Sequence, residues 1–137
     1  MLKVLIVDRN NSIRGQILEA YLTKFLGKGT QVVSAGLEGT GIDPQAVRIM
    51  AEDGYVIAGQ NSKCLGEVST YPYNLILYCS EKLKLETNLE KESCQIICAN
   101  FIEMEGFGGA ERLERMRKLR DDIKSYATEL AKRLKNN

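Results

Sequence analysis

KVLIVDRNNSIRGQILEAYL, residues 3–22, contains the transition that decides the fold of this chain. The run from Leu2 to Val7 is short and rich in leucine and β-branched residues, which is typical of a strand buried on both faces of a parallel sheet. Apolar residues then recur at spacings of three and four from Ile17 to Phe25, which predicts an amphipathic helix beginning near Gly15. A strand that leads through a polar loop into a helix is the repeating unit of an α/β fold.

The rest of the chain continues this alternation. Further strands are predicted at Thr30 to Ala35, Asn74 to Cys79 and Ser93 to Ala99. Helices are predicted after the Asp43–Pro44 cap, ending near Gly54, and after the loop Phe101 to Gly109. A short helical turn is expected after the cap Asn61-Ser62-Lys63, and the charged segment Lys82 to Lys91 has no clear pattern.

Strands that alternate with helices predict a three-layer α/β fold, in which a four-stranded parallel sheet carries helices on both faces. A chain of 137 residues suits one domain with a sizeable core, so we expect a single α/β domain over residues 1–137. Ligands bind at the carboxyl ends of the strands in such sheets. The loop after the first strand, residues 8–14, is therefore the expected site.

Composition narrows the classes of function. Nineteen basic and eighteen acidic residues give a net charge of +1, which argues against a general nucleic-acid binder. No apolar run approaches the roughly 20 residues that cross a bilayer, and Asp8 and Arg9 interrupt any apolar signal segment. Four cysteines without paired spacing suit a reducing compartment. We therefore expect a cytoplasmic protein that binds neither nucleic acid nor membranes.

The chain contains no histidine. Histidine is the usual general base near neutral pH and the commonest metal ligand. Ser–His catalysis, Cys–His catalysis and histidine-based metal sites are therefore excluded. The sequence predicts neither a metal site nor a cofactor, and the remaining chemistry must use carboxylates, lysines, arginines, thiols or backbone dipoles.

Taken alone, the opening KVLIVDRNNSIR resembles the start of a response-regulator receiver domain. That resemblance implies a pair of acidic residues after the first strand, but here the second position is Arg9. It also implies a phospho-accepting aspartate at the end of the third strand, where this chain has Leu77-Tyr78-Cys79-Ser80. A receiver-like domain is therefore the weaker alternative.

A second set of landmarks runs in order through residues 3–79. They are Asn11, Ser12 and Arg14 in the first loop, Ser34-Ala35-Gly36 after the second strand, Pro44, Ala46 and Met50 in the next helix, and Ser62-Lys63-Cys64-Leu65 in a later turn. In this order they resemble the low-molecular-weight protein tyrosine phosphatase superfamily, including its thioredoxin-coupled arsenate reductases. The resemblance implies a phosphatase-like fold with an anion-binding loop of pattern Cys-x5-Arg.

The resemblance implies roles for individual positions of that loop, which comprises Asp8, Arg9, Asn10, Asn11, Ser12, Ile13 and Arg14. In active relatives the first residue is a cysteine whose thiolate attacks phosphorus, and the final arginine clamps the oxyanion. Here Asp8 stands at the nucleophile position and Arg14 at the clamp position, while Gly15 replaces a hydroxyl residue that supports the nucleophile. Relatives also protonate the leaving group from an Asp-Pro loop, which the segment Ala99 to Glu105 lacks.

These departures predict a catalytically impaired relative that works as a binding or regulatory module with a remnant anion-binding loop. A carboxylate about 4 Å from a bound phosphate costs about 4 kcal/mol for each pair of like unit charges at an effective dielectric constant of about 20. We therefore expect Asp8 to fill the loop as a built-in anion held by Arg14. Phosphate-like anions should bind weakly, and the sequence names no protein partner.

An active hydrolase remains the alternative, with Asp8 as an unconventional nucleophile. Aspartate accepts phosphoryl groups in other enzymes, usually beside magnesium, but the loop offers no second acidic ligand. Glu103 or Glu105 would then supply the acid. The interpretation we favour for both residues is that they are solvated loop carboxylates.

The resemblance to arsenate reductases implies a relay of three cysteines. The first is replaced by Asp8, Cys79 falls at the position of the second, and the region Lys82 to Lys91 contains no third. We expect Cys64, Cys94 and Cys98 to be buried core thiols. A redox pair of Cys79 and Cys98 at neighbouring strand ends remains open.

Overall fold

The computed structural model describes residues 1–68, 72–87, 89 and 94–136. Its four strands form one sheet in the order β2-β1-β3-β4, and every neighbouring pair is parallel. The strands are β1 (Leu2–Asp8), β2 (Thr30–Gly36), β3 (Leu75–Tyr78) and β4 (Gln95–Cys98). The predicted four-stranded parallel sheet is therefore confirmed. Ser93, the expected first residue of the fourth strand, lies outside the described residues.

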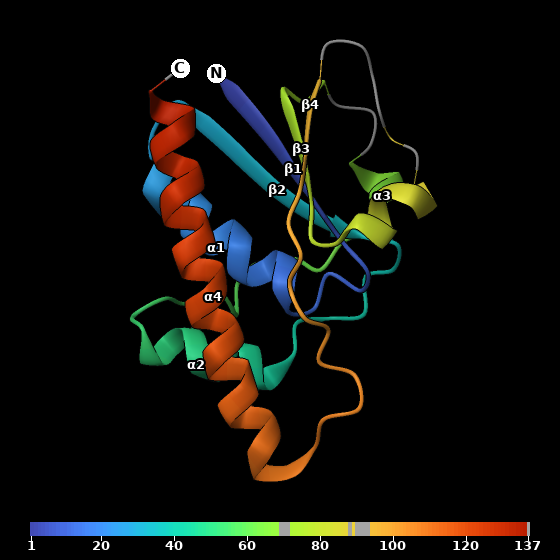
Figure 1. Cartoon of the computed structure of the whole chain (residues 1–137), viewed down its shortest axis with the longest axis vertical. Helices are drawn as coiled ribbons and strands as arrows, with labels where there is room; N and C mark the ends of the chain where they lie inside the picture. The colour runs from blue at the N-terminus through green and yellow to red at the C-terminus, as the bar shows by residue number, and fades with distance from the viewer. Residues whose placement is uncertain (69–71, 88, 90–93, 137) are drawn as a thin grey trace.

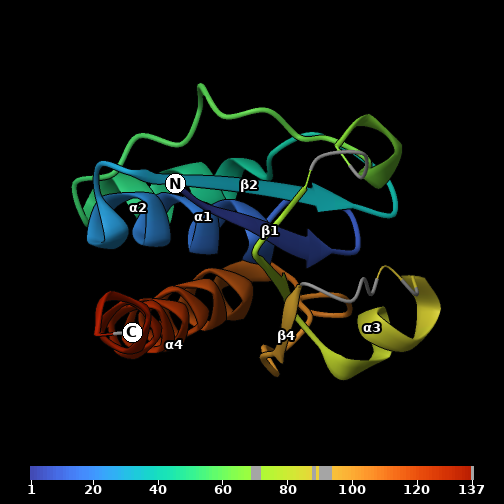
Figure 2. The same ribbon diagram turned by 90° about the horizontal axis from the view of Figure 1, so that it is seen from above.

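The helices are α1 (Arg14–Leu26), α2 (Pro44–Glu52), α3 (Glu81–Thr87) and α4 (Gly109–Lys135), with a short 3-10 helix η1 (Leu65–Glu67). Figures 1 and 2 show α1, α2 and α4 together on one side of the sheet and α3 on the other. This arrangement confirms the predicted three layers. No helix within the described residues is long and apolar enough to cross a membrane.

Two local features differ from the sequence-based expectation. The residues Asn61-Ser62-Lys63 do not cap a helix; the short helix begins after Cys64, whose N–H donates to the Glu67 carboxylate at 2.9 Å. Helix α3 arises in the charged segment for which no pattern was found. Leu83 is its one buried side chain among the described residues, so the segment has too little apolar periodicity to predict a helix.

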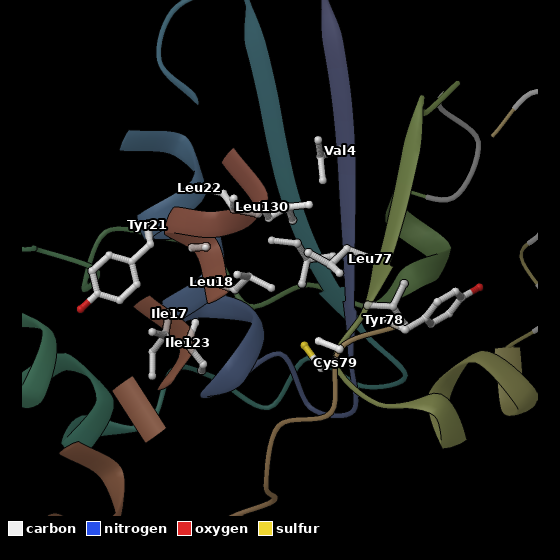
Figure 3. Close-up of a cluster of buried hydrophobic side chains, with 14 of the residues drawn as sticks. Val4, Ile17, Leu18, Tyr21, Leu22, Leu77, Tyr78, Cys79, Ile123 and Leu130 are labelled. Atoms are coloured by element: carbon white, nitrogen blue, oxygen red, sulfur yellow. The ribbon is translucent and has the colours of Figure 1, made fainter. Parts of the chain in front are cut away.

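The main core lies between the sheet and the pair α1 and α4. Figure 3 shows Leu18 of α1 and Leu130 of α4 gathered near Leu77 of β3. Each of these side chains is at most 1% exposed, and burying a leucine contributes about 1.5–3 kcal/mol. Tyr78, the next residue of β3, points to the opposite side of the sheet (Figure 3). The long final helix therefore docks through its apolar stripe onto α1 and the sheet, as predicted.

The end of β1 is the position from which the loop departs. The register pairs Asp8 with Gly36 on one side, and it pairs Val7 with Tyr78 on the other. Asp8 thus leaves the sheet between two neighbouring strands, at the edge where parallel sheets bind ligands. Gly36 is required here, because a Cβ atom would lie 2.7 Å from the carbonyl oxygen of Arg9.

A polar contact at Asp53, the C-cap residue of α2, joins that helix to α1 and α4. The Tyr21 hydroxyl and the Lys124 ammonium both donate to Oδ2 of Asp53, at 2.8 and 2.9 Å. The hydrogen bond from Lys124 lowers the pKa of the Asp53 carboxyl in the folded protein. A lowered pKa stabilises the fold above the unfolded pKa, and this stabilisation is lost as the pH falls through the folded value.

We therefore expect Asp53→Asn to lower the free energy of unfolding by about 1 kcal/mol near pH 7 and by much less near pH 3. Denaturant unfolding at the two pH values measures the difference. Asp122→Asn is the control, because Asp122 forms an exposed pair with Lys118 at 3.3 Å on α4, the helix that also carries Lys124. An Asp53→Asn deficit of equal size at both pH values would contradict the prediction.

Candidate functional site

The loop of residues 8–14 joins β1 to α1 and is held by a second loop. The carbonyl oxygens of Asp8, Arg9, Asn10 and Ser12 accept hydrogen bonds from N–H groups of residues 37–43, with distances of 3.0 to 3.3 Å. These carbonyl groups are therefore turned toward the neighbouring loop. The negative ends of the peptide dipoles point away from the centre of the first loop, which favours an anion there.

Buried amides hold the middle of the loop in place. Asn11 adopts a left-handed backbone conformation with φ of 50°, and its side-chain N–H donates to the Ser34 carbonyl at 3.1 Å. The Gln16 amide bridges the carbonyl oxygens of Asn11 and Asn61, with both distances at 3.0 Å. Since Asn11 and Gln16 are fully buried, these contacts give the loop one conformation.

The Asp8 carboxylate lies inside the loop, and the residue is 3% exposed. Its Oδ1 atom accepts the Arg9 backbone N–H at 2.9 Å and lies 3.0 Å from Nη2 and 3.2 Å from Nε of Arg14. Its Oδ2 atom accepts the Gly15 N–H at 2.9 Å. The Arg14 residue is itself 4% exposed. One carboxylate oxygen thus binds Arg14 and a backbone N–H group, and the other oxygen binds a second backbone N–H group.

The same carboxylate completes the beginning of α1. Ile13, the residue before this helix, provides no side-chain cap, and the first N–H groups of a helix lack partners within it. The Gly15 N–H finds its partner in Asp8, seven residues earlier. A negative charge at this position also interacts favourably with the helix dipole.

The outer side of Arg14 is engaged by the loop between β4 and α4. Its Nη1 donates to the Phe101 carbonyl at 3.0 Å, and its Nη2 lies 3.5 Å from Oε1 of Glu103. The same Glu103 oxygen lies 3.5 Å from Nε of Arg9. Glu103 is exposed, as expected for a solvated loop carboxylate, and its carboxylate also pairs with both arginines. Glu105 is exposed and fits that interpretation.

Arg9 is also tied to α3. Two guanidinium nitrogens of Arg9 donate to the two carboxylate oxygens of Glu86, at 3.0 and 3.3 Å. This hydrogen bonding lowers the pKa of the Glu86 carboxyl. Glu86 was not among the predicted site residues, because the segment that carries it has no apolar pattern.

A cleft of about 320 Å³ opens over the loop. It is lined by the loop, by residues 103–107 and by the pair Asp43–Arg112, whose carboxylate and guanidinium groups approach to 2.7 Å. No group of three or more histidine, cysteine, aspartate or glutamate side chains in the described part of the chain is arranged to hold a metal ion. The cleft thus combines acidic and basic side chains.

The cysteines are placed differently from the sequence-based expectation. Cys79 is fully buried, whereas Cys64 and Cys94 are half-buried and Cys98 is exposed. The prediction that Cys64, Cys94 and Cys98 are buried core thiols was therefore wrong. Cys98 is the last residue of the edge strand β4, and Cys64 lies in the loop directly before η1, so both lie at the periphery of the sheet.

The redox pair of Cys79 and Cys98, which the sequence left open, has unfavourable geometry. The register pairs Cys98 with Tyr78, and Tyr78 and Cys79 point to opposite sides of the sheet (Figure 3). The two thiols therefore project toward opposite faces. Burial raises the pKa of the Cys79 thiol well above its ordinary value, which disfavours the reactive thiolate.

Gly15 lies against the carboxylate. A Cβ atom at this position would lie 3.1 Å from Cβ of Asp8, 3.3 Å from Oδ2 of Asp8 and 3.1 Å from Oδ1 of Asn11. That Asn11 oxygen is buried and accepts no hydrogen bond from the described residues. The absence of a side chain at residue 15 thus leaves room for the carboxylate and also removes a possible hydroxyl donor to Asn11.

Comparisons with known proteins agree with this fold. A family model described as low molecular weight phosphotyrosine protein phosphatase matches residues 3–137. The arsenate reductase of Brevibacillus brevis is 48% identical over 52 residues, which are 38% of this chain and 39% of that protein. The glutaredoxin arsenate reductase of Synechocystis sp. is 36% identical over 78 residues, which are 56% of this chain and 59% of that protein. The chain thus spans less than two thirds of these relatives.

Solved structures match over nearly the whole chain. An arsenate reductase in the oxidised state has a TM-score of 0.80 and 26% identity, and the match covers 97% of this chain and 98% of that one. The Vibrio vulnificus protein Wzb, in complex with benzylphosphonate, has a TM-score of 0.81 and 20% identity, with 96% of this chain and 98% of that one covered. The second likeness shows the fold alone.

Replacing Gly15 with alanine tests how tightly the carboxylate is packed. Alanine is favoured over glycine in a helix by about 1 kcal/mol, but the new Cβ would crowd Asp8 and Asn11, neither of which has space to move. We expect a net loss of about 1–3 kcal/mol in the free energy of unfolding. Denaturant unfolding measures it. A stabilised Gly15→Ala protein would show that the carboxylate is held loosely.

Gly59→Ala is the control for this experiment. A Cβ atom there meets nothing within 4 Å, so we expect a change within about 0.5 kcal/mol.

Proposed function

We propose that this chain, which belongs to the low molecular weight phosphotyrosine protein phosphatase family, is a catalytically impaired member that works as a binding or regulatory module. In this proposal the anion-binding loop of residues 8–14 is a remnant, and Asp8 occupies it permanently. Phosphate-like anions then bind weakly, and the protein acts through the surface of the fold.

The contacts of Asp8 carry the proposal. Its two oxygens accept hydrogen bonds from two backbone N–H groups and from Arg14, at 2.9 to 3.2 Å, which is the pattern of contacts an external oxyanion would need. Like charges about 4 Å apart at an effective dielectric constant of about 20 repel by about 4 kcal/mol. That repulsion corresponds to a loss of about a thousandfold in phosphate affinity.

The later loop supports the same conclusion. The segment Ala99 to Glu105 contains no Asp-Pro pair, and the carboxylate of Glu103 is paired with two arginines. A general acid must reach the atom that it protonates. Both the nucleophile and the acid of active relatives are therefore replaced.

We further propose that residues 1–137 form one domain that works in the cytoplasm. One family model spans residues 3–137, and the four cysteines suit a reducing compartment. The net charge of +1 gives no general attraction to nucleic acid.

Asp8→Ala should turn an internally filled loop into one that depends on an external anion. The change leaves Arg14 buried without its main partner, so we expect a loss of about 3–5 kcal/mol of stability. Phosphate at about one hundred times its dissociation constant should then restore about 2.7 kcal/mol. Thermal unfolding in rising phosphate concentrations, with sodium chloride at matched ionic strength as the control, measures this rescue.

The unmodified protein serves as the reference for that series, and its midpoint of unfolding should not respond to phosphate, arsenate or vanadate. Asp8→Asn, which keeps the shape of the side chain, replaces Asp8→Ala if the latter does not fold. Tight anion binding by the unmodified protein would contradict the proposal.

Aryl phosphate hydrolysis by the unmodified protein, stimulated by magnesium and lost in Asp8→Ala, would instead support the alternative of an active hydrolase with Asp8 as nucleophile.

Asp8→Cys tests what remains of the catalytic scaffold. A thiolate in the loop should attack para-nitrophenyl phosphate, whose leaving group needs no protonation. We expect weak hydrolysis of this ester and none detectable of a phenyl ester, because a missing general acid costs about 10²–10⁴-fold. The assay needs excess reductant, since Cys79 is buried directly after β3, beside the end of β1. Equal rates on both esters would reveal a general acid in the cleft.

A further inference from the structure

We propose that Glu103 is a specificity-determining residue: it is a second internal anion that keeps doubly charged oxyanions away from Arg14. The inference rests on the proposed function, because it adds a second carboxylate to the one that fills the loop. It concerns a residue that lies 95 positions after Asp8 in the sequence.

Each of the three nitrogen atoms of the Arg14 guanidinium group already contacts a group of the chain itself. Its Nε and Nη2 atoms contact Oδ1 of Asp8, and its Nη1 donates to the Phe101 carbonyl at 3.0 Å. Glu103 approaches the same Nη2 atom from the cleft side at 3.5 Å. A phosphate that binds through two parallel N–H bonds of an arginine would have to displace both carboxylates or lie against them.

The position of Glu103 is set by anchored neighbours. The Phe101 N–H donates to the Cys79 carbonyl at 3.1 Å, and the Phe101 ring packs edge-on against Tyr126 of α4 with centroids 5.2 Å apart. Met104, on the other side of Glu103, is buried. The segment is thus fixed on both sides of Glu103, which directs the carboxylate toward the arginines.

Arg9 strengthens this arrangement. Its guanidinium interacts with Glu86 of α3 and also lies 3.5 Å from Glu103, so it forms a bridge between the two carboxylates. The Glu103 side chain is 42% exposed, and water therefore screens its charge in part. The expected effect is accordingly smaller than that of the buried Asp8.

Glu105 provides a matched control within the same loop. It lines the same cleft and carries the same charge, but no ion pair joins it to Arg9 or Arg14 within the described residues. If Glu103 acts through its place beside the arginines, removing its charge should matter more than removing the charge of Glu105.

The experiment compares two tetrahedral anions that keep a constant charge across neutral pH, sulfate with two charges and methanesulfonate with one. Calorimetric titration is carried out on Asp8→Ala, Asp8→Ala/Glu103→Gln and Asp8→Ala/Glu105→Gln. Relative to Asp8→Ala, we expect Glu103→Gln to raise sulfate affinity about tenfold and methanesulfonate affinity about threefold, because a dianion feels twice the repulsion. Glu105→Gln should change either affinity less than twofold.

Equal effects of Glu103→Gln and Glu105→Gln, or an equal effect on both anions, would overturn the inference. If Asp8→Ala alone binds no sulfate, the remnant anion-binding loop of the proposed function is contradicted unless Glu103→Gln restores the binding. Binding that then appears with Glu103→Gln would still support the role of Glu103, and its absence would overturn both. Asp8→Asn replaces Asp8→Ala throughout if the latter does not fold.

Discussion

A buried arginine at the beginning of a helix needs an anion, and the rest of this structure depends on how that need is met. Arg14 is almost fully buried, and the N–H groups at the start of α1 lie beside it. In this chain the anion is the carboxylate of Asp8, the last residue of β1, which lies at the centre of the loop. A buried pair of this kind contributes little net stability compared with apolar packing, but removing one partner is costly.

The loop that holds this pair is built from segments far apart in the sequence. N–H groups of residues 37–43 donate to its outward-facing carbonyl oxygens, and the side-chain amides of Asn11 and Gln16 connect it to Asn61. The loop between β4 and α4 closes it from the other side through Phe101 and Glu103. A change at Asp8 therefore affects four segments together, which explains why its replacement is expected to alter stability and anion binding together.

The functional interpretation follows from charge. In the family to which this chain belongs, the site is suited to an incoming oxyanion, and structures of similar fold include an arsenate reductase in the phosphate binding state and Wzb with benzylphosphonate. Here two carboxylates of the chain itself face the arginine that would clamp such a ligand. This arrangement of charges supports the proposal that the protein works through binding or regulation.

Local patterns in the sequence were sufficient for the sheet, the long helices and the place of the anion-binding loop. The apolar run before Asp8 and the apolar stripe of the last helix are periodic patterns that a sequence displays. The Asp43–Pro44 cap is a contact between near neighbours in the chain, so it too can be recognised locally. The orientation of Asp8, the bridging position of Glu103 and the pairing of Arg9 with Glu86 were decided by the tertiary structure alone. These contacts join residues 6 to 94 positions apart across loops that have no period, so their geometry exists only once the sheet and helices have packed.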